Sequence, residues 1–173
     1  MELLARRARP LGPDVTVDRD RDGAGRPRSA RPRDELGRPL DYGETGVPAI
    51  PDDLVLTPTE ALSQAQQLID DDRAFQAHEV LEVAWKAAPG SERDLWRGLA
   101  QLAVGLTHAQ RGNLVGAARL LRRGADRIEP WETRRPHQID VAGLITWAAS
   151  TADQLEASQS DQLRAPRLTR TDR

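Results

Sequence analysis

The sequence contains no cysteine and one lysine, Lys86, and only 3% of its residues are aromatic. Without cysteine, disulfide bonds and thiolate metal sites are excluded. The hydrophobic content of 38% is below that of an average globular core. We therefore expect part of the 173 residues to lie outside the folded core.

Long hydrophobic runs are also missing. No apolar stretch approaches the roughly 20 residues of a membrane-spanning helix, and the N-terminal arginines are not followed by the apolar region of a secretory signal. The net charge of −2 gives no reason for the whole chain to bind nucleic acid or a membrane. We therefore expect a cytoplasmic protein that makes no membrane contact.

Both ends of the sequence are polar and rich in arginine, and neither shows an apolar period. Such segments bury too little surface to offset the entropy of ordering, which predicts disorder at 1–50 and at 159–173. Residues 1–33 hold nine arginines against five acidic residues. A basic arm of this kind can bind nucleic acid, although we favour a solvated tail. The folded domain is predicted at 51–158, where 11 basic and 16 acidic residues give a charge of −5.

The predicted domain shows helical periodicity and no useful strand alternation. Thr57-Pro58-Thr59-Glu60 is a capping box with proline at the first helical position. Gly112-Asn113 is a tight break that makes its two flanking helices an antiparallel hairpin, and Asp140 caps the last helix. These signals predict an all-α fold of about five helices, at 57–70, 73–88, 92–111, 114–127 and 140–158.

A weak internal repeat supports stacked hairpins. The spacing of Ala77, Leu81 and Ala84 is that of the second helix of a tetratricopeptide unit, and it recurs 40 residues later at Ala117 and Leu121. Because this offset differs from the usual period of about 34 residues, we expect a small, weakly tetratricopeptide-like bundle instead of a true repeat protein.

Two glycines point to a close helix contact. Gly98 and Gly105 lie seven residues apart on the predicted helix 92–111. Glycine destabilises a helix by about 1 kcal/mol against alanine, so a pair in register suggests that another helix approaches closely. If that helix is 73–88, Gln101 and His108 come near its polar residues.

The stretch from Phe75 to Trp85 carries the main chemical candidates. His78 and Glu82 are four residues apart and are therefore neighbours on a helix surface. Glu79 points about 100° away from His78, so a ligand shared with Glu79 needs a second helix. An imidazole beside a carboxylate at the margin of a core can act as an acid–base pair or bind a metal.

Two functions stay open at this point. In the first, His78, Glu82 and His108 are catalytic candidates, or they hold a divalent transition metal such as zinc, iron or manganese, with water present for hydrolysis. Glu79 is a further candidate metal ligand, and Gln101 completes the polar cluster. In the second, the same residues form a buried network in a helical interaction module. No nucleophile elbow or phosphate loop is present, so the reaction type is unassigned and enzymatic activity stays open. Assembly into a homo-oligomer also stays open.

Arginines crowd the outer face of the predicted helix 114–127. They are Arg119, Arg122, Arg123 and Arg127. Such a group can grip phosphates, but a solvated helix face is the commoner explanation, and we favour it here.

The polar residues also belong to a recognisable pattern. Residues 75–85 follow Phe-x-x-His-Glu-x-x-Glu-x-x-Trp, Gly98-Leu99-Ala100-Gln101 comes next, and His108 precedes Gly112-Asn113 and Gly116-Ala117. In this order the elements resemble the family known as domain of unknown function 309, over about 58–145. The resemblance implies a compact all-helical fold and no settled activity. The family's polar motif positions correspond here to His78, Glu79, Glu82, Gln101 and His108.

Overall fold

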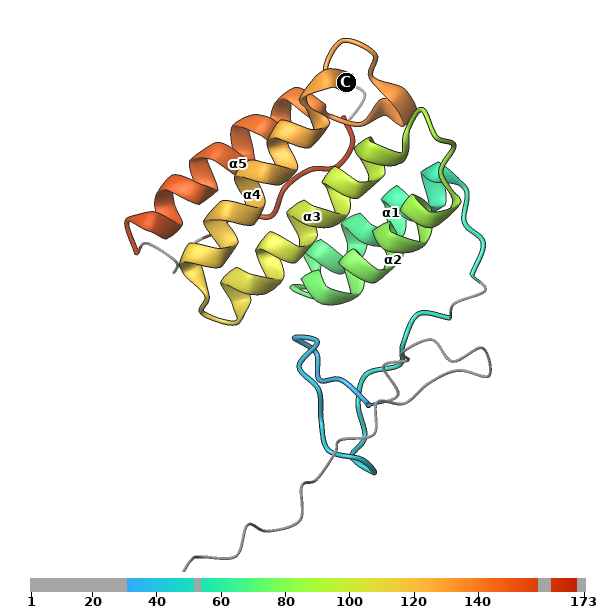
Figure 1. Ribbon diagram of the computed structural model, residues 1–173, viewed down its shortest axis with the longest axis vertical. Coiled ribbons are helices and arrows are strands. Elements are labelled where there is room, and N and C mark those ends of the chain that lie inside the picture. Colours follow the sequence, from blue (N-terminus) through green and yellow to red (C-terminus); the bar gives the residue numbers. More distant parts are fainter. Residues whose placement is uncertain (1–30, 52–53, 159–162, 171–173) are drawn as a thin grey trace, which may run out of the picture. The chain divides into compact units, whose positions relative to one another are not determined.

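The computed structural model describes residues 31–51, 54–158 and 163–170. Among them there is no strand, only two isolated bridges, Arg33–Pro39 and Ile139–Thr169. The predicted all-α fold is confirmed (Figure 1). The helices are α1 (Pro58–Asp70), α2 (Ala74–Ala87), α3 (Arg93–Gln110), α4 (Leu114–Ile128) and α5 (Val141–Glu156), with the 3-10 turns η1 (Glu129–Trp131) and η2 (Pro136–Gln138).

The helix starts follow the predicted capping signals. The Thr57 hydroxyl accepts from the Glu60 backbone N–H at 3.3 Å, and the Glu60 carboxylate accepts from the Thr57 backbone N–H at 2.8 Å. Asn113 and Asp140 each accept a hydrogen bond from the backbone N–H three residues further on. These bonds satisfy donors that a helix leaves unpaired at its first turn, so local sequence sets where α1, α4 and α5 begin.

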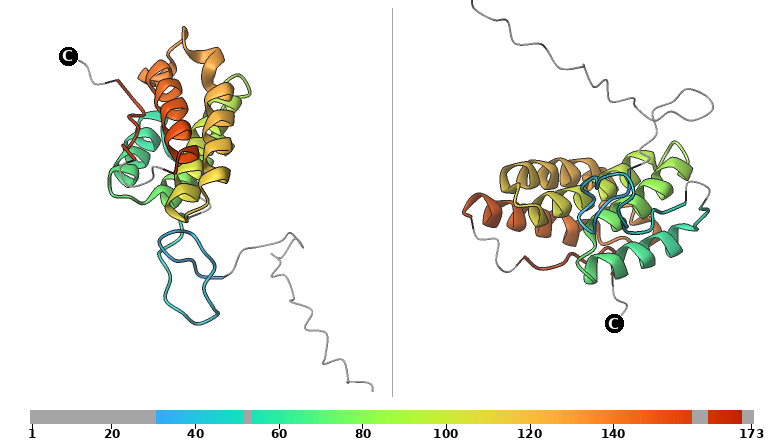
Figure 2. Two further views of the ribbon diagram at one scale, coloured as in Figure 1. Left: turned by 90° about the vertical axis from the view of Figure 1, so that its left-hand side faces the viewer. Right: turned by 90° about the horizontal axis from the view of Figure 1, so that it is seen from below.

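The helices pack as antiparallel neighbours around α3. This helix contacts α2 on one side and α4 on the other. Helix α1 packs against α2 and α5 packs against α4, both on the same face of this three-helix layer (Figures 1 and 2). No helix in the described part of the chain combines the length and apolar character needed to cross a lipid bilayer.

The two glycines of α3 do mark a close helix contact, and their partner is α4, not α2. A Cβ atom at Gly98 would lie 2.5 Å from Cγ2 of Ile128, and one at Gly105 would lie 2.8 Å from Cδ2 of Leu121. Real Cβ atoms do not approach so closely, so any side chain at either place would force its α4 neighbours to shift. The two glycines therefore allow α3 and α4 to pack closely together.

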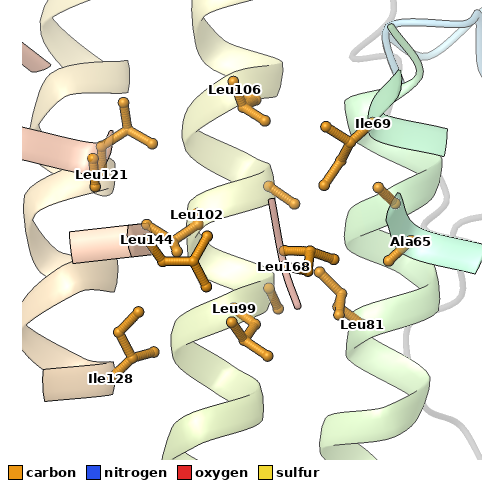
Figure 3. Packing of buried hydrophobic residues seen from close by; sticks show 14 of the residues in the cluster. Ala65, Ile69, Leu81, Leu99, Leu102, Leu106, Leu121, Ile128, Leu144 and Leu168 are labelled. Carbon is orange, nitrogen blue, oxygen red and sulfur yellow. The ribbon is translucent and has the colours of Figure 1, made fainter. Parts of the chain in front are cut away.

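The core is built mainly from leucine and alanine of all five helices. Three core residues come from outside them: Ala88, Ile139 and Leu168. Leu168, from the chain beyond α5, is 1% exposed and belongs to the same cluster as Leu99 and Leu144 (Figure 3). Its backbone N–H donates to Oε1 of Gln66 at 2.8 Å. The predicted disorder of 159–173 remains a prediction for 159–162 and 171–173, which lie outside the described residues.

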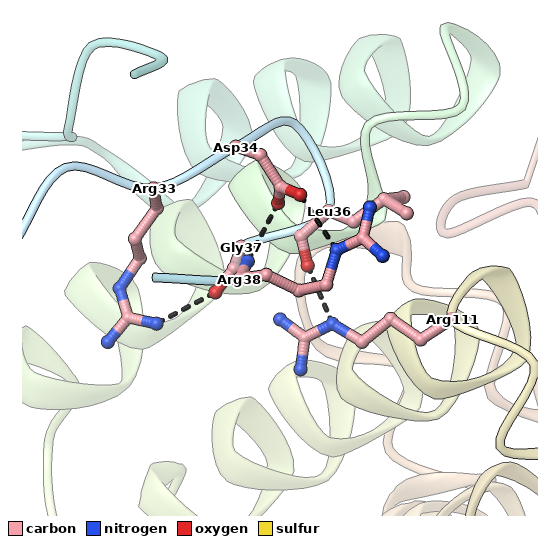
Figure 4. Close-up of polar contacts among 6 residues, drawn as sticks. All are labelled: Arg33, Asp34, Leu36, Gly37, Arg38 and Arg111. Carbon is pink, nitrogen blue, oxygen red and sulfur yellow. Dashed lines mark hydrogen bonds and ion pairs between the residues drawn. The ribbon is translucent and has the colours of Figure 1, made fainter. Parts of the chain in front are cut away.

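Residues ahead of α1 also contact the helices. Gly37 is buried against the Phe75 ring, so closely that a Cβ atom would overlap that ring. The guanidinium carbons of Arg33 and Arg111 lie 5.6 and 5.9 Å from the ring centroid of Phe75. Nε of Arg111 donates to the Leu36 carbonyl at 2.7 Å (Figure 4). Residues 1–30, where most of the predicted N-terminal tail falls, are outside the described part.

Candidate functional site

A groove of about 570 Å³ lies where α2, α3 and α4 meet. We call it the α2–α4 groove. It brings together His78, Glu82 and Gln101, three residues of the predicted polar cluster. The complete lining is His78, Glu82, Trp85, Arg97, Ala100, Gln101, Val104, Leu120, Arg123 and Arg127.

Two lining residues sit one turn apart on α2. Nε2 of His78 lies 3.7 Å from Oε2 of Glu82, and Oε1 of Glu82 lies 3.1 Å from Nζ of Lys86. The adjoining face of the helix is fully buried through Ala77 and Leu81. The sequence places an imidazole–carboxylate pair at the edge of the core, as the helical spacing predicted.

The surroundings of the His78 imidazole favour its neutral form. Burial lowers its pKa below the usual value, Glu82 opposes that change, and Lys86 adds to it. Its Nδ1 is buried and has no hydrogen-bond partner among the described residues. A neutral imidazole with an unpaired ring nitrogen can accept a proton or a hydrogen bond.

Trp85 and two arginines, Arg97 and Arg127, also line the groove. The guanidinium carbon of Arg97 lies 5.6 Å from the ring centroid of Trp85. Nη1 of Arg127 donates to Asp94 at 3.0 Å. Nε1 of Trp85 and Nε of Arg127 are buried without a partner in the described part of the chain. Because buried polar groups are normally paired, these two donors mark the groove as a place where a ligand can complete the hydrogen bonding.

The role of α4 in this site was not predicted from the sequence. Of the arginines assigned to a solvated face, Arg123 and Arg127 line the groove. Arg122 instead pairs with Asp153 at 2.7 Å and Glu156 at 2.6 Å on α5. A helical wheel gives the face of each arginine but not the neighbouring helix, so only the packing of α4 on α3 could separate these roles.

Two of the candidate residues lie outside the groove lining. Burial raises the pKa of Glu79, and nearby Arg33 opposes this effect. Nδ1 of His108 lies 2.9 Å from Nδ2 of Asn113 at the α3–α4 turn. His108 is seven residues beyond Gln101, which corresponds to about 10 Å along the helix axis. His108 therefore serves the helix junction in this arrangement.

The side chains in and around the groove also limit how a metal ion could bind there. Within the described ranges, no group of three or more histidine, aspartate or glutamate residues is placed to hold a metal ion. The groove itself offers two such side chains, His78 and Glu82. A metal there would need further ligands from Gln101, water or a bound molecule, and the metal site stays a hypothesis.

Comparisons with known proteins support the resemblance. Residues 62–120 match the model of a family described as a domain of unknown function (DUF309). The "Uncharacterized protein YpuF" of Bacillus subtilis (strain 168) is 48% identical over 85 residues, which cover 47% of this chain and 48% of that protein. The chain thus spans about half the length of this curated relative. No solved structure matches the chain.

Proposed function

We propose that the helical domain matching DUF309 binds an anionic small molecule in the α2–α4 groove, where His78 and Glu82 act as an acid–base pair. The observation that carries this proposal is the charge of the lining. It contains three arginines and one glutamate, whereas residues 51–158 as a whole carry a charge of −5.

This local excess of positive charge suits an anion. A concave site lined by one sign of charge attracts ligands of the opposite sign. Arginine forms paired hydrogen bonds with carboxylate and phosphate groups. Arg123 has no hydrogen bond or ion pair with another described residue, so its guanidinium is available to a ligand, and the flat Trp85 ring can cover an apolar part of that ligand.

The histidine supports chemistry beyond binding. A neutral imidazole can accept a proton from a bound molecule, and a neighbouring carboxylate stabilises the imidazolium that forms. A purely structural network is expected to leave few buried atoms unpaired. The unpaired nitrogens of His78, Trp85 and Arg127 therefore favour a ligand site over a network that only fixes helix register.

The test uses sulfate, whose charge stays constant across the working pH range, in calorimetric titrations of the full chain. We expect Arg123→Gln to weaken sulfate binding by about tenfold or more, since a hydrogen bond to a charged group contributes about 1.5–3 kcal/mol. The matched control is Arg119→Gln, which removes an exposed arginine of α4 that does not line the groove. Equal losses in the two variants, or no saturable binding, would reject the proposal.

A second arm tests the histidine. Protonation adds a positive charge to His78, so sulfate affinity should rise as the pH falls through the pKa of His78. His78→Gln should remove that rise and leave the arginine-dependent binding. If zinc instead binds stoichiometrically, and His78→Gln and Glu82→Gln each abolish that binding, the groove is a metal site.

A further inference from the structure

Residues 163–170, which we call the C-terminal segment, lie against α1, α5 and η2 in the manner of a bound peptide (red in Figure 1). The carbonyl of Leu168 accepts from the Asp140 backbone N–H at 2.9 Å. The Gln66 side-chain amide makes two hydrogen bonds with the main chain of the segment, one on each side of Arg167. Its Oε1 accepts from the Leu168 N–H at 2.8 Å, and its Nε2 donates to the Pro166 carbonyl at 3.0 Å.

Further main-chain contacts extend along the segment. Nε1 of Trp147 donates to the Arg164 carbonyl at 2.7 Å, and the Arg170 N–H donates to the Gln138 carbonyl at 3.1 Å. Recognition of an extended peptide commonly combines main-chain hydrogen bonds, which supply affinity, with pockets for alternate side chains, which supply specificity. The contacts of this segment have that form.

The side-chain contacts define a preference. Leu168 is 1% exposed and enters the core, and Pro166 is buried as well. Nη1 of Arg167 pairs with Oδ2 of Asp70 on α1 at 3.2 Å. The site that holds this segment therefore favours a peptide with a buried leucine that follows an arginine.

The segment does not fill the whole site. A groove of about 520 Å³ adjoins it, with Thr169 of the segment as part of its wall. Its other lining residues are Thr59, Leu62, Ser63, Gln66, Gln67, Asp70, Asp71, His137 and Gln138. With two aspartates and no arginine or lysine in this lining, the open part suits a basic side chain.

We propose that the α1–α5 side of the domain is a docking site for an extended basic peptide of a partner protein, anchored by leucine, and that the C-terminal segment occupies this site as an intramolecular competitor. The segment buries two side chains, Leu168 and Pro166, while Arg164, Arg167 and Arg170 remain exposed. Elements with few buried apolar contacts open without global unfolding. A tethered competitor has a high effective concentration, so it raises the peptide concentration needed for docking.

Hydrogen exchange of the full wild-type chain tests the opening. We expect the amide of Leu168 to exchange at least about tenfold faster than the buried amides of α3, because a local opening releases the segment alone. Exchange of Leu168 only through global unfolding would overturn the proposal.

Docking is tested with a labelled peptide that has the sequence of residues 163–170. Full-length Leu168→Ser should bind it about tenfold or more tightly than wild type, because the internal competitor is weakened. Adding Gln66→Ala should abolish that gain, and a peptide with serine in place of its anchor leucine should not bind. If Leu168→Ser does not fold, Arg167→Glu weakens the segment while keeping the anchor. Absence of peptide binding to the folded variant, or binding that ignores Gln66→Ala, would overturn the docking site.

A second copy of the chain is the competing occupant. Light scattering that shows a wild-type dimer, lost in Leu168→Ser, would mean that the copies exchange their C-terminal segments and would overturn the assignment to a partner peptide. A monomer at all concentrations supports it.

Discussion

The two segments that flank the helices, 31–51 and 163–170, are similar in composition and differ in their contacts. Both are polar and rich in arginine, and neither contains a helix. The second places Leu168 in the core at 1% exposure. The first rests on Phe75 through Gly37 and bonds Arg111 through the Leu36 carbonyl.

The difference shows that burial in such segments is decided by single residues. Composition averages over a window, so one leucine among arginines leaves it unchanged. A leucine that enters the core removes its whole side chain from water, which is worth about 1.5–3 kcal/mol. A glycine that packs beneath a ring buries far less apolar surface. We therefore expect 163–170 to contribute much more stability than 31–51.

The largest expected effect is that of Leu168→Ala. Removing a large side chain from a packed core costs about 2–5 kcal/mol, because transfer energy is lost and a cavity remains. Urea unfolding of the full chain measures it. Leu36→Ala, at a partly exposed leucine of the other segment, should cost less than about 1 kcal/mol. Similar losses of unfolding free energy at Leu168 and Leu36 would show that the two segments contribute equally to stability.

Gln66→Ala comes next. It leaves the Leu168 N–H and the Pro166 carbonyl, which are partly buried, without their Gln66 partner. Because an unpaired buried group costs about 1–3 kcal/mol, we expect a loss toward the lower end of that range. Urea unfolding again gives the value. The control is Gln67→Ala, which changes the exposed neighbour on α1 and should be nearly neutral. If Gln66→Ala also leaves the free energy of unfolding unchanged, the Gln66 hydrogen bonds add no stability beyond that of the buried Leu168.

Two glycine substitutions test how much the contact of residues 31–51 with Phe75 contributes to stability. Gly37 has φ +73° and lies against Phe75, whereas Gly43 has φ +94° and nothing within 4 Å of its added Cβ. Alanine at either place meets the left-handed penalty of about 1–2 kcal/mol, so an additional loss in Gly37→Ala reports the packing on Phe75. Thermal melting of both variants measures the difference. Equal melting temperatures would show that this packing adds no stability.

The smallest effect concerns charge. Burial raises the pKa of Glu79 and Arg33 opposes the rise, so Arg33→Gln should raise that pKa further. A carboxyl whose pKa is higher in the folded state binds more protons there, and its stabilisation, complete below the unfolded pKa, is lost as the pH rises through the folded pKa. Arg33→Gln should therefore extend the loss to higher pH.

Unfolding free energies between about pH 4 and about pH 7 measure this change. Glu79→Gln is the control background, in which Arg33→Gln should have no pH-dependent effect. A pH dependence that Arg33→Gln leaves unchanged would indicate that the N-terminal segment does not act on α2 through charge.

The sequence predicted the helices well because their signals are local. The box at Thr57 and the caps at Asn113 and Asp140 use contacts within four residues of the chain. Gly98 and Gly105 also predicted a close approach. The identity of the approaching helix depends on how the hairpins stack, which no helical wheel contains, and the structure assigns it to α4.

The candidate site was predictable in part for the same reason. His78 and Glu82 share a helix face, so their pairing followed from spacing alone. Gln101 joins them from α3. Arg123 reaches the groove only because α4 packs on α3, and Leu168 reaches the core across 102 residues of sequence from Gln66. Neither contact leaves a periodic signal.

That long separation has a consequence for the order of assembly. Local contacts such as the α3–α4 hairpin form early, since closing a short loop costs little entropy. Leu168 contacts Gln66 from 102 positions away. During translation, all five helices are therefore made before Leu168, which packs among them. Until residue 168 has left the ribosome, the apolar site that it fills in the core of the nascent domain is empty. In that interval a leucine of another chain can bind in the site that Leu168 later fills.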